Sequence, residues 1–158
     1  MPLDPDTFRA VLGRFASGLT IITMRSGHAD FGMTVSSFCS LSLDPPLVVA
    51  CIDRKAEMHD LLTGGQRIVV NILSATQEPL SRRFSEEHGA RRFEGIGFSR
   101  NENGIVLLDD VLARLDCRVT ERYAGGDHTL VVAEVDGATT RDLRPLLHYR
   151  GGYAELER

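Results

Sequence analysis

Short apolar runs rich in β-branched residues recur along this chain, and each ends at a turn signal. Two of them, Leu47–Ile52 and Arg67–Leu73, have the length of a strand and are predicted to be fully buried. Two longer runs, Ala113–Tyr123 and Thr129–Val135, flank an Ala-Gly-Gly-Asp sequence that is typical of a hairpin turn. Short strands at near-regular spacing with few helices indicate a mainly β fold, an antiparallel barrel with small peripheral helices.

Three further segments complete the predicted strands. Leu19–Met24 predicts one strand, and Gly32–Pro46, which alternates small polar and apolar residues, predicts two short strands or one bent strand. Pro145–Tyr153 predicts the last strand, whereas Gly89–Gly104 has no period and predicts a long excursion. The total is six or seven strands, and 158 residues is the size of one domain, which we expect to span residues 1–158.

Helical periodicity is confined to three segments. From Asp6, apolar residues at helical spacing predict an amphipathic surface helix with Asp6 or Thr7 as its N-cap and Gly18 as its terminator. Ala56–Leu62 and Thr76–Glu87 predict two shorter helices.

Charge and hydropathy exclude several classes of partner. The net charge of −4 and the scattered basic residues give no electrostatic footprint for nucleic acid or anionic lipid. No apolar run approaches the ~18 residues of a membrane span, and residues 1–6 lack the basic and apolar regions of a signal peptide. We therefore expect a cytoplasmic protein.

Cysteine and histidine patterns argue against a metal site. Cys39, Cys51 and Cys117 are an odd set without CxxC spacing, and all three are expected to be buried thiols. The five histidines show no paired ligand spacing, so no metal site is expected, and His59 and His148 are predicted to be structural. Dinucleotide-fold, P-loop and hydrolase-elbow motifs are also absent from the sequence.

Hydroxyl residues crowd the segment between Gly32 and Pro46, with apolar residues between them. Such a strand suits a flat ligand with a polar edge, although a serine-rich edge strand explains the composition equally well. The hydroxyl residues are Thr34, Ser36, Ser37, Ser40 and Ser42.

Six segments, in order along nearly the whole chain, resemble the flavin reductase-like family. The resemblance implies an FMN-binding Greek-key split barrel that transfers hydride from NADH or NADPH to FMN or FAD. It also implies a homodimer that supplies reduced flavin to a partner monooxygenase. There are two alternatives. One is a non-catalytic FMN-binding electron carrier, and the other is an FMN-dependent reductase of another substrate such as a corrinoid. The segments are Phe15–Thr23, Gly32–Pro46, Cys51–Arg54, Val70–Leu73, Gly126–His128, and Pro145–Tyr149 with Gly152 and Tyr153.

The resemblance also implies flavin-binding residues. Backbone amides and hydroxyls along one strand would address the polar edge of the flavin ring, and a second strand would lie under the ribityl chain. The first set is Met33, Thr34, Val35, Ser36 and Ser37, and the second is Ala50, Cys51 and Asp53. The phosphate would meet Arg54 and Lys55 at the start of a short helix, whose dipole would assist, together with Ser81 and Arg82. A solvated helix face is the alternative for Arg82.

For the nicotinamide, the Gly-Asp-His sequence assigns the central role to His128. Its imidazole would stack on or donate to the nicotinamide, with Asp127 accepting a hydrogen bond from the other ring nitrogen. Tyr153 would flank the pocket. The alternatives are a turn-forming role for Asp127 and an ordinary core position for Tyr153.

Overall fold

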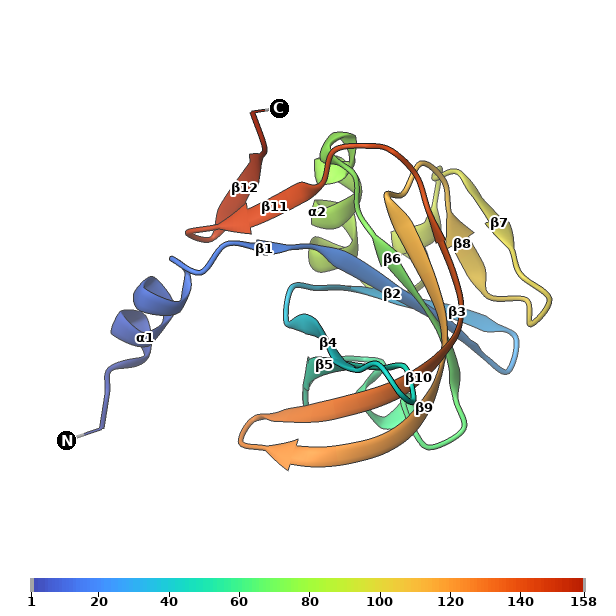
Figure 1. Ribbon diagram of the computed structural model, residues 1–158, viewed down its shortest axis with the longest axis horizontal. Coiled ribbons are helices and arrows are strands. Elements are labelled where there is room, and N and C mark those ends of the chain that lie inside the picture. Colours follow the sequence, from blue (N-terminus) through green and yellow to red (C-terminus); the bar gives the residue numbers. More distant parts are fainter. Residues whose placement is uncertain (1, 158) are drawn as a thin grey trace.

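Seven antiparallel strands form the central sheet of the protein. In the computed structural model, which describes residues 2–157, they follow the order β3-β2-β6-β9-β10-β5-β4. The sheet curls into a barrel in which β4 and β5 approach the β2–β3 hairpin (Figure 1). The strands are β2 Thr20–Ser26, β3 Ala29–Val35, β4 Phe38–Ser42, β5 Leu47–Asp53, β6 Arg67–Ile72, β9 Ala113–Gly125 and β10 His128–Thr140. The mainly β, antiparallel fold is the one predicted.

Buried and half-buried residues alternate along β5, and the buried ones point into the barrel. Val48, Ala50 and Ile52 are buried, whereas Val49 and Cys51 between them are only half-buried. The prediction that this run is buried on both faces was therefore wrong, because its other face opens onto the groove described below. The centre of β6, in contrast, is buried throughout.

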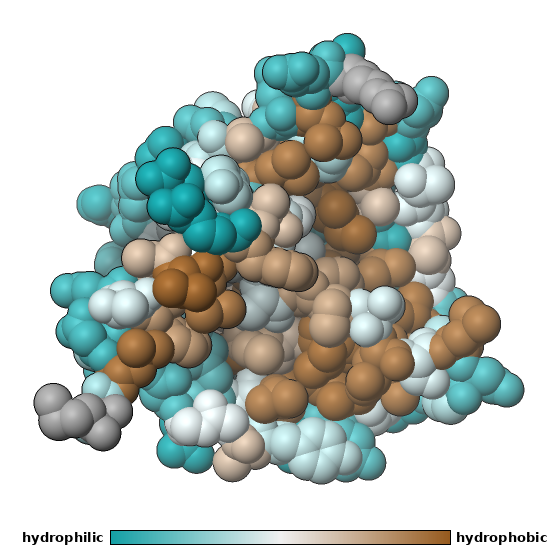
Figure 2. Space-filling view, turned by 60° about the vertical axis from the view of Figure 1, so that its left-hand side comes forward, coloured by the Kyte–Doolittle hydropathy of each residue, from teal (hydrophilic) through white to brown (hydrophobic). Residues whose placement is uncertain are grey.

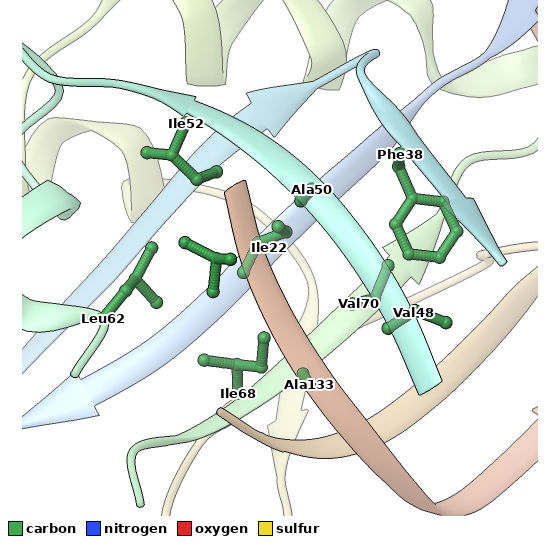
Figure 3. Close-up of a pocket in the computed structure, with 10 residues that line it drawn as sticks. Ile22, Phe38, Val48, Ala50, Ile52, Leu62, Ile68, Val70 and Ala133 are labelled. Carbon is green, nitrogen blue, oxygen red and sulfur yellow. The ribbon is translucent and has the colours of Figure 1, made fainter. Parts of the chain in front are cut away.

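The barrel interior is tightly filled. Figure 3 shows Ile22, Ala50, Ile52 and Ala133, from three strands, around a small cavity. The volume of this cavity is about 10 Å³. That space is no larger than one water molecule needs, so the interior itself offers no room for an organic ligand.

A second apolar cluster covers the outer face of the sheet beneath α2 (Glu78–Glu86). Phe84 of α2 is buried there and meets Phe93 edge to face, with ring centroids 5.1 Å apart. Gly32 of β3 lies against both rings. Three short 3-10 helices also occur, at His59–Leu61, Ala75–Gln77 and Gly89–Phe93.

Two small sheets flank the barrel. The strands β1 (Ser17–Gly18), β11 (Leu146–Tyr149) and β12 (Gly152–Glu155) form one, and β7 (Phe98–Arg100) with β8 (Val106–Leu108) forms the other. The predicted final strand is thus a hairpin, and the predicted excursion Gly89–Gly104 contains a 3-10 helix and β7, the first strand of another hairpin.

The first helix differs in its limits from the prediction. Helix α1 spans Pro5–Leu12, Asp4 caps it by accepting a hydrogen bond from the Thr7 amide, and it ends at Gly13 rather than Gly18. None of its residues is buried. Among residues 2–157, no helix has the length and apolar character needed to cross a membrane.

Candidate functional site

A groove of about 690 Å³ lies between α1, the β3–β4 corner, β5 and the β11–β12 turn. Figure 2 shows apolar side chains gathered on this hollowed face, the one on which α1 lies in Figure 1. The residues that line the groove are Phe8, Arg9, Leu12, Gly13, Phe15, Ser17, Ser36, Ser37, Phe38, Cys39, Val49, Cys51, His148 and Gly151. Its size and mostly apolar walls are those of a pocket for a small organic ligand.

Polar groups enter the groove at the corner between β3 and β4. Ser36 and Ser37 form this corner, and both are exposed. The Ser37 hydroxyl donates to the Cys51 carbonyl over 2.8 Å, and the Cys51 amide donates to the Ser37 carbonyl over 2.9 Å. The corner is therefore fixed to β5, which holds the Ser36 hydroxyl and its backbone at the groove in a defined position.

The cysteines differ from their prediction as a uniformly buried set. Cys39 is exposed and Cys51 is half-buried, and both line the groove because they lie on the outer face of their strands. Cys117 is buried, and burial raises its pKa to about 12.

Three of the predicted flavin contacts turn their side chains away from the groove. Val35 and Ala50 are buried in the barrel core, and Met33 packs against the same core. Thr34 faces outward, yet its hydroxyl donates to the Ser81 carbonyl over 2.8 Å. At Met33, Val35 and Ala50, only backbone groups are left for contact with a flavin. Side-chain contacts would come from neighbouring residues that face outward, such as Ser36 and Cys51.

A second polar cluster joins α2 to β12. The Ser81 and Tyr153 hydroxyls are 3.0 Å apart, and the Arg82 guanidinium lies 4.8 Å from the centroid of the Tyr153 ring. Arg82 also donates to Glu78 over 3.2 Å. The ring of His148, a groove residue, meets Tyr153 at a centroid distance of 6.3 Å. Ser81, Arg82 and Tyr153 are thus brought together, and His148 connects them to the groove.

A third cluster forms where β5 ends beside the start of β10. His128 pairs with Asp53 across the two strands, and the Arg54 amide donates to the Asp127 carbonyl over 3.0 Å. The Asp53 carboxylate accepts from the Lys55 amide over 2.8 Å. The structure therefore brings together residues that were predicted for three parts of the site: Asp53 for the ribityl chain, Arg54 and Lys55 for the flavin phosphate, and Asp127 and His128 for the nicotinamide.

Within that cluster, the Asp127 carboxylate contacts the imidazole of His128. The His128 Nδ1 lies 2.7 Å from the Asp127 Oδ1. The hydrogen bond from His128 holds the pKa of the Asp127 carboxyl below its usual range. With Nδ1 engaged by the carboxylate, Nε2 is the ring nitrogen left for a ligand.

The predicted helix after Lys55 is absent. Residues 54–58 form turns that lead into the 3-10 helix at His59–Leu61. The segment before Gly64 is too short to repay the cost of nucleating an α-helix. The proposed contribution of a helix dipole to phosphate binding at Lys55 is therefore wrong.

Sequence reasoning missed the contributions of α1 and His148. Phe8, Arg9 and Leu12 line the groove, whereas the sequence predicted only an amphipathic surface helix here. His148 was predicted to be structural, yet it lines the groove. His59, in contrast, bonds the Thr129 hydroxyl over 2.7 Å and Asp60 over 2.8 Å, as a structural histidine does.

Comparison with known proteins agrees with this geometry. A family model described as flavin reductase like domain matches residues 12–157. The chain is 36% identical over 152 residues to the NADH-dependent FMN reductase SmoA of Agrobacterium fabrum, covering 96% of this chain and 86% of that protein. It is 36% identical over 158 residues to HsaB of Mycobacterium tuberculosis, the reductase subunit of a flavin-dependent monooxygenase, with 98% and 84% covered.

Solved structures of flavin reductases share the fold. The flavin reductase PheA2 is 35% identical with a TM-score of 0.89, and the match covers 99% of this chain and 100% of that one. The NADH:FAD oxidoreductase SgcE6 of Streptomyces globisporus, solved with NAD and FAD fragments, is 34% identical with a TM-score of 0.90, covering 99% and 96%. With the family model matched from residue 12 to residue 157, the chain belongs to the flavin reductase-like family.

Proposed function

We propose that this chain is an NAD(P)H-dependent flavin reductase that reduces FMN or FAD and supplies the reduced flavin to a separate monooxygenase. The groove carries this proposal, because it joins apolar walls to the Ser36–Ser37 corner and reaches the β5 strand that ends beside His128. The relatives named as NADH-dependent FMN and FAD reductases support the reaction class.

Each part of the site has a distinct task in this proposal. The Ser36–Ser37 corner and the outer face of β5 position the flavin, which supplies the electron-accepting ring when bound. His128, held by Asp127, orients the nicotinamide. Hydride transfer between two stacked rings needs no protein acid or base, so the contribution of the chain is alignment.

We further propose that the protein acts as a homodimer, as one domain over residues 1–158, in the cytoplasm. The exposed apolar residues of α1 support the dimer. None of the side chains of α1 is buried by its own chain, so packing against a second subunit would supply the stability that a short helix needs. NADH is a cytoplasmic reductant, which supports the location.

Steady-state kinetics with purified protein test the function. We expect NADH or NADPH oxidation that depends on added FMN or FAD, and modest flavin affinity in fluorescence titrations, because a flavin that is a substrate must leave after each turnover. Binding of FMN without nicotinamide oxidation would instead support the electron-carrier alternative. Failure to bind either flavin at millimolar concentration would overturn the proposed function.

A further inference from the structure

Two of the three thiols of this chain lie in the wall of the groove. Cys39 of β4 is exposed, Cys51 of β5 is half-buried, and both line the groove. The proposed hydride transfer uses neither thiol. Cys117, in contrast, is buried in the barrel core, where burial raises its pKa to about 12. A buried thiol of this kind is unreactive, so the chain contains its own reference for the two groove thiols.

Strand register sets the spacing of the two groove thiols. Cys39 pairs with Val49 across β4 and β5, and Val49 also lines the groove, so Cys51 is the diagonal neighbour of Cys39 on the same face. Diagonal Cα atoms of an antiparallel pair are roughly 7–8 Å apart, whereas a disulfide needs about 4.4–6.8 Å. The two thiols are therefore too far apart to be joined as a disulfide, yet close enough to contact the same aromatic ring.

The groove has the shape and polarity for a flat, electron-poor ring. Its volume of about 690 Å³ and its mostly apolar walls, with Phe8 and Phe15 among them, are those of a site for a small organic ligand. Ser36 lines the same groove and has a hydroxyl that can donate to a carbonyl oxygen of such a ring. Quinones combine a flat apolar body with two carbonyl oxygens and a double bond that thiols attack.

The addition of a thiol to a quinone is balanced without any further reagent. The sulfur electron pair forms the S–C bond to a ring carbon, and the π pair of the ring double bond moves to a carbonyl oxygen. That oxygen takes up the proton that leaves the thiol. The product is the thioether of the hydroquinone, so no external oxidant or reductant takes part.

We propose that Cys39 and Cys51 together form a covalent modification site for quinones, at which a quinone binds in the groove, adds to either thiol and closes the groove to flavin. A fused two-ring quinone is about as long as the separation of the two thiols, so one bound molecule covers both. The site therefore takes one quinone per chain. The modification depends on the groove alone, and only its effect on flavin reduction rests on the proposed function.

Labelling of the wild-type protein with 1,4-naphthoquinone, without nicotinamide or flavin, tests the site. We expect the labelling rate to saturate with quinone concentration, because binding precedes bond formation. Below saturation, the rate constant should exceed that of N-acetylcysteine at least about tenfold, since the groove holds the two reactants together. Mass spectrometry of the intact chain should show one naphthoquinone, and its peptides should place it on Cys39 or Cys51 and not on Cys117.

Two results with the wild type would overturn the proposal without any variant. One is a labelling rate that rises in proportion to quinone concentration throughout, and the other is a chain that gains two naphthoquinones. Either result describes thiols that react independently because they are exposed. Iodoacetamide is the matched reagent, because it is small and has no ring. It should alkylate both groove thiols of one chain, at rates proportional to its concentration.

Serine variants test whether the two thiols share one site. Cys39→Ser and Cys51→Ser should each take up one naphthoquinone on the remaining thiol, and the double variant should lose the saturable reaction. Loss of all labelling in one of the single variants would show that a single thiol reacts and would contradict the shared site. A saturable adduct in the double variant would place the reaction elsewhere and would also contradict it.

Activity assays separate this inference from the proposed function. After removal of free quinone, labelled wild type should oxidise nicotinamide with added flavin at least about tenfold more slowly than its untreated sample, because an occupied groove excludes flavin. The double variant should keep the rate of its own untreated sample. Full activity of completely labelled wild type would refute closure of the groove. Saturable labelling of a protein that neither binds flavin nor oxidises nicotinamide would refute the proposed function and leave the modification site standing.

Discussion

At the scale of single residues, the pair Asp127 and His128 offers the sharpest test of the catalytic geometry. If His128 aligns the nicotinamide, His128→Ala should leave flavin affinity nearly unchanged and lower kcat/KM for the nicotinamide roughly 10- to 150-fold. Stopped-flow measurement of flavin reduction at varied NADH concentrations checks this. A folded variant with wild-type kcat/KM would show that the residue only completes the hairpin.

Asp127→Asn serves as the graded comparison in the same experiment. The asparagine side chain preserves the turn but removes the carboxylate, so we expect a smaller loss of kcat/KM for the nicotinamide than in His128→Ala. Because the hydrogen bond from His128 lowers the pKa of Asp127, this carboxyl is ionised at neutral pH and is protonated only as pH falls through that lowered value. Above pH ~5 the difference between the wild type and Asp127→Asn should therefore not depend on titration of this carboxyl.

At the scale of elements, Gly32 sets how closely α2 and the 3-10 helix at Gly89–Phe93 approach β3. A Cβ at this position would lie 2.6 Å from Phe84 Cε2 and 3.1 Å from Phe93 Cζ, inside a packed aromatic pair. We expect Gly32→Ala to lower the free energy of unfolding by roughly 1–3 kcal/mol, the usual cost of overpacking. Urea denaturation measures the change. Gly18→Ala is the control, because a Cβ there meets no atom within 4 Å, and an equal loss in both variants would rule out the steric cause.

Local patterns predicted the elements whose signals are contained within one strand or hairpin. The runs at β5 and β6 and the β9–β10 turn are of this kind, since period and turn residues suffice to define them. The hairpin of β11 and β12 was missed, although its two-residue turn has one sequence signal. Arg150 and Gly151 have φ values of 52° and 74°, and only the glycine indicates such a conformation.

The candidate site was predictable to the extent that family motifs carry it. Asp127 and His128 are neighbours in the sequence, whereas Asp53 meets them only through the pairing of β5 with β10. His148 lines the groove because β11 pairs with β1, a contact between residues far apart in the sequence, so only the fold reveals its place there.

At the scale of the whole molecule, the exposed apolar side of α1 leads to an expected assembly. Val11 is 61% exposed and does not line the groove, so it reports on association rather than on flavin contact. Light scattering should give about twice the 17.4 kDa mass of one chain. Val11→Glu should shift the mass toward one chain, because a carboxylate resists burial in an apolar interface.

The control for this change is Leu143→Glu, since Leu143 is exposed in the segment between β10 and β11. It should leave the dimer intact. A wild-type mass of 17.4 kDa at micromolar concentration with full activity would contradict the dimer.

The two faces of β5 have a consequence for how the protein can be re-engineered. Val48, Ala50 and Ile52 are committed to the barrel, whereas Val49, Cys51 and Asp53 are turned outward. Within the seven residues of β5, the residues that can contact a ligand therefore alternate with the residues that pack in the core. A combinatorial library that varies only the odd-numbered positions can explore new flavin analogues while the scaffold's core stays intact.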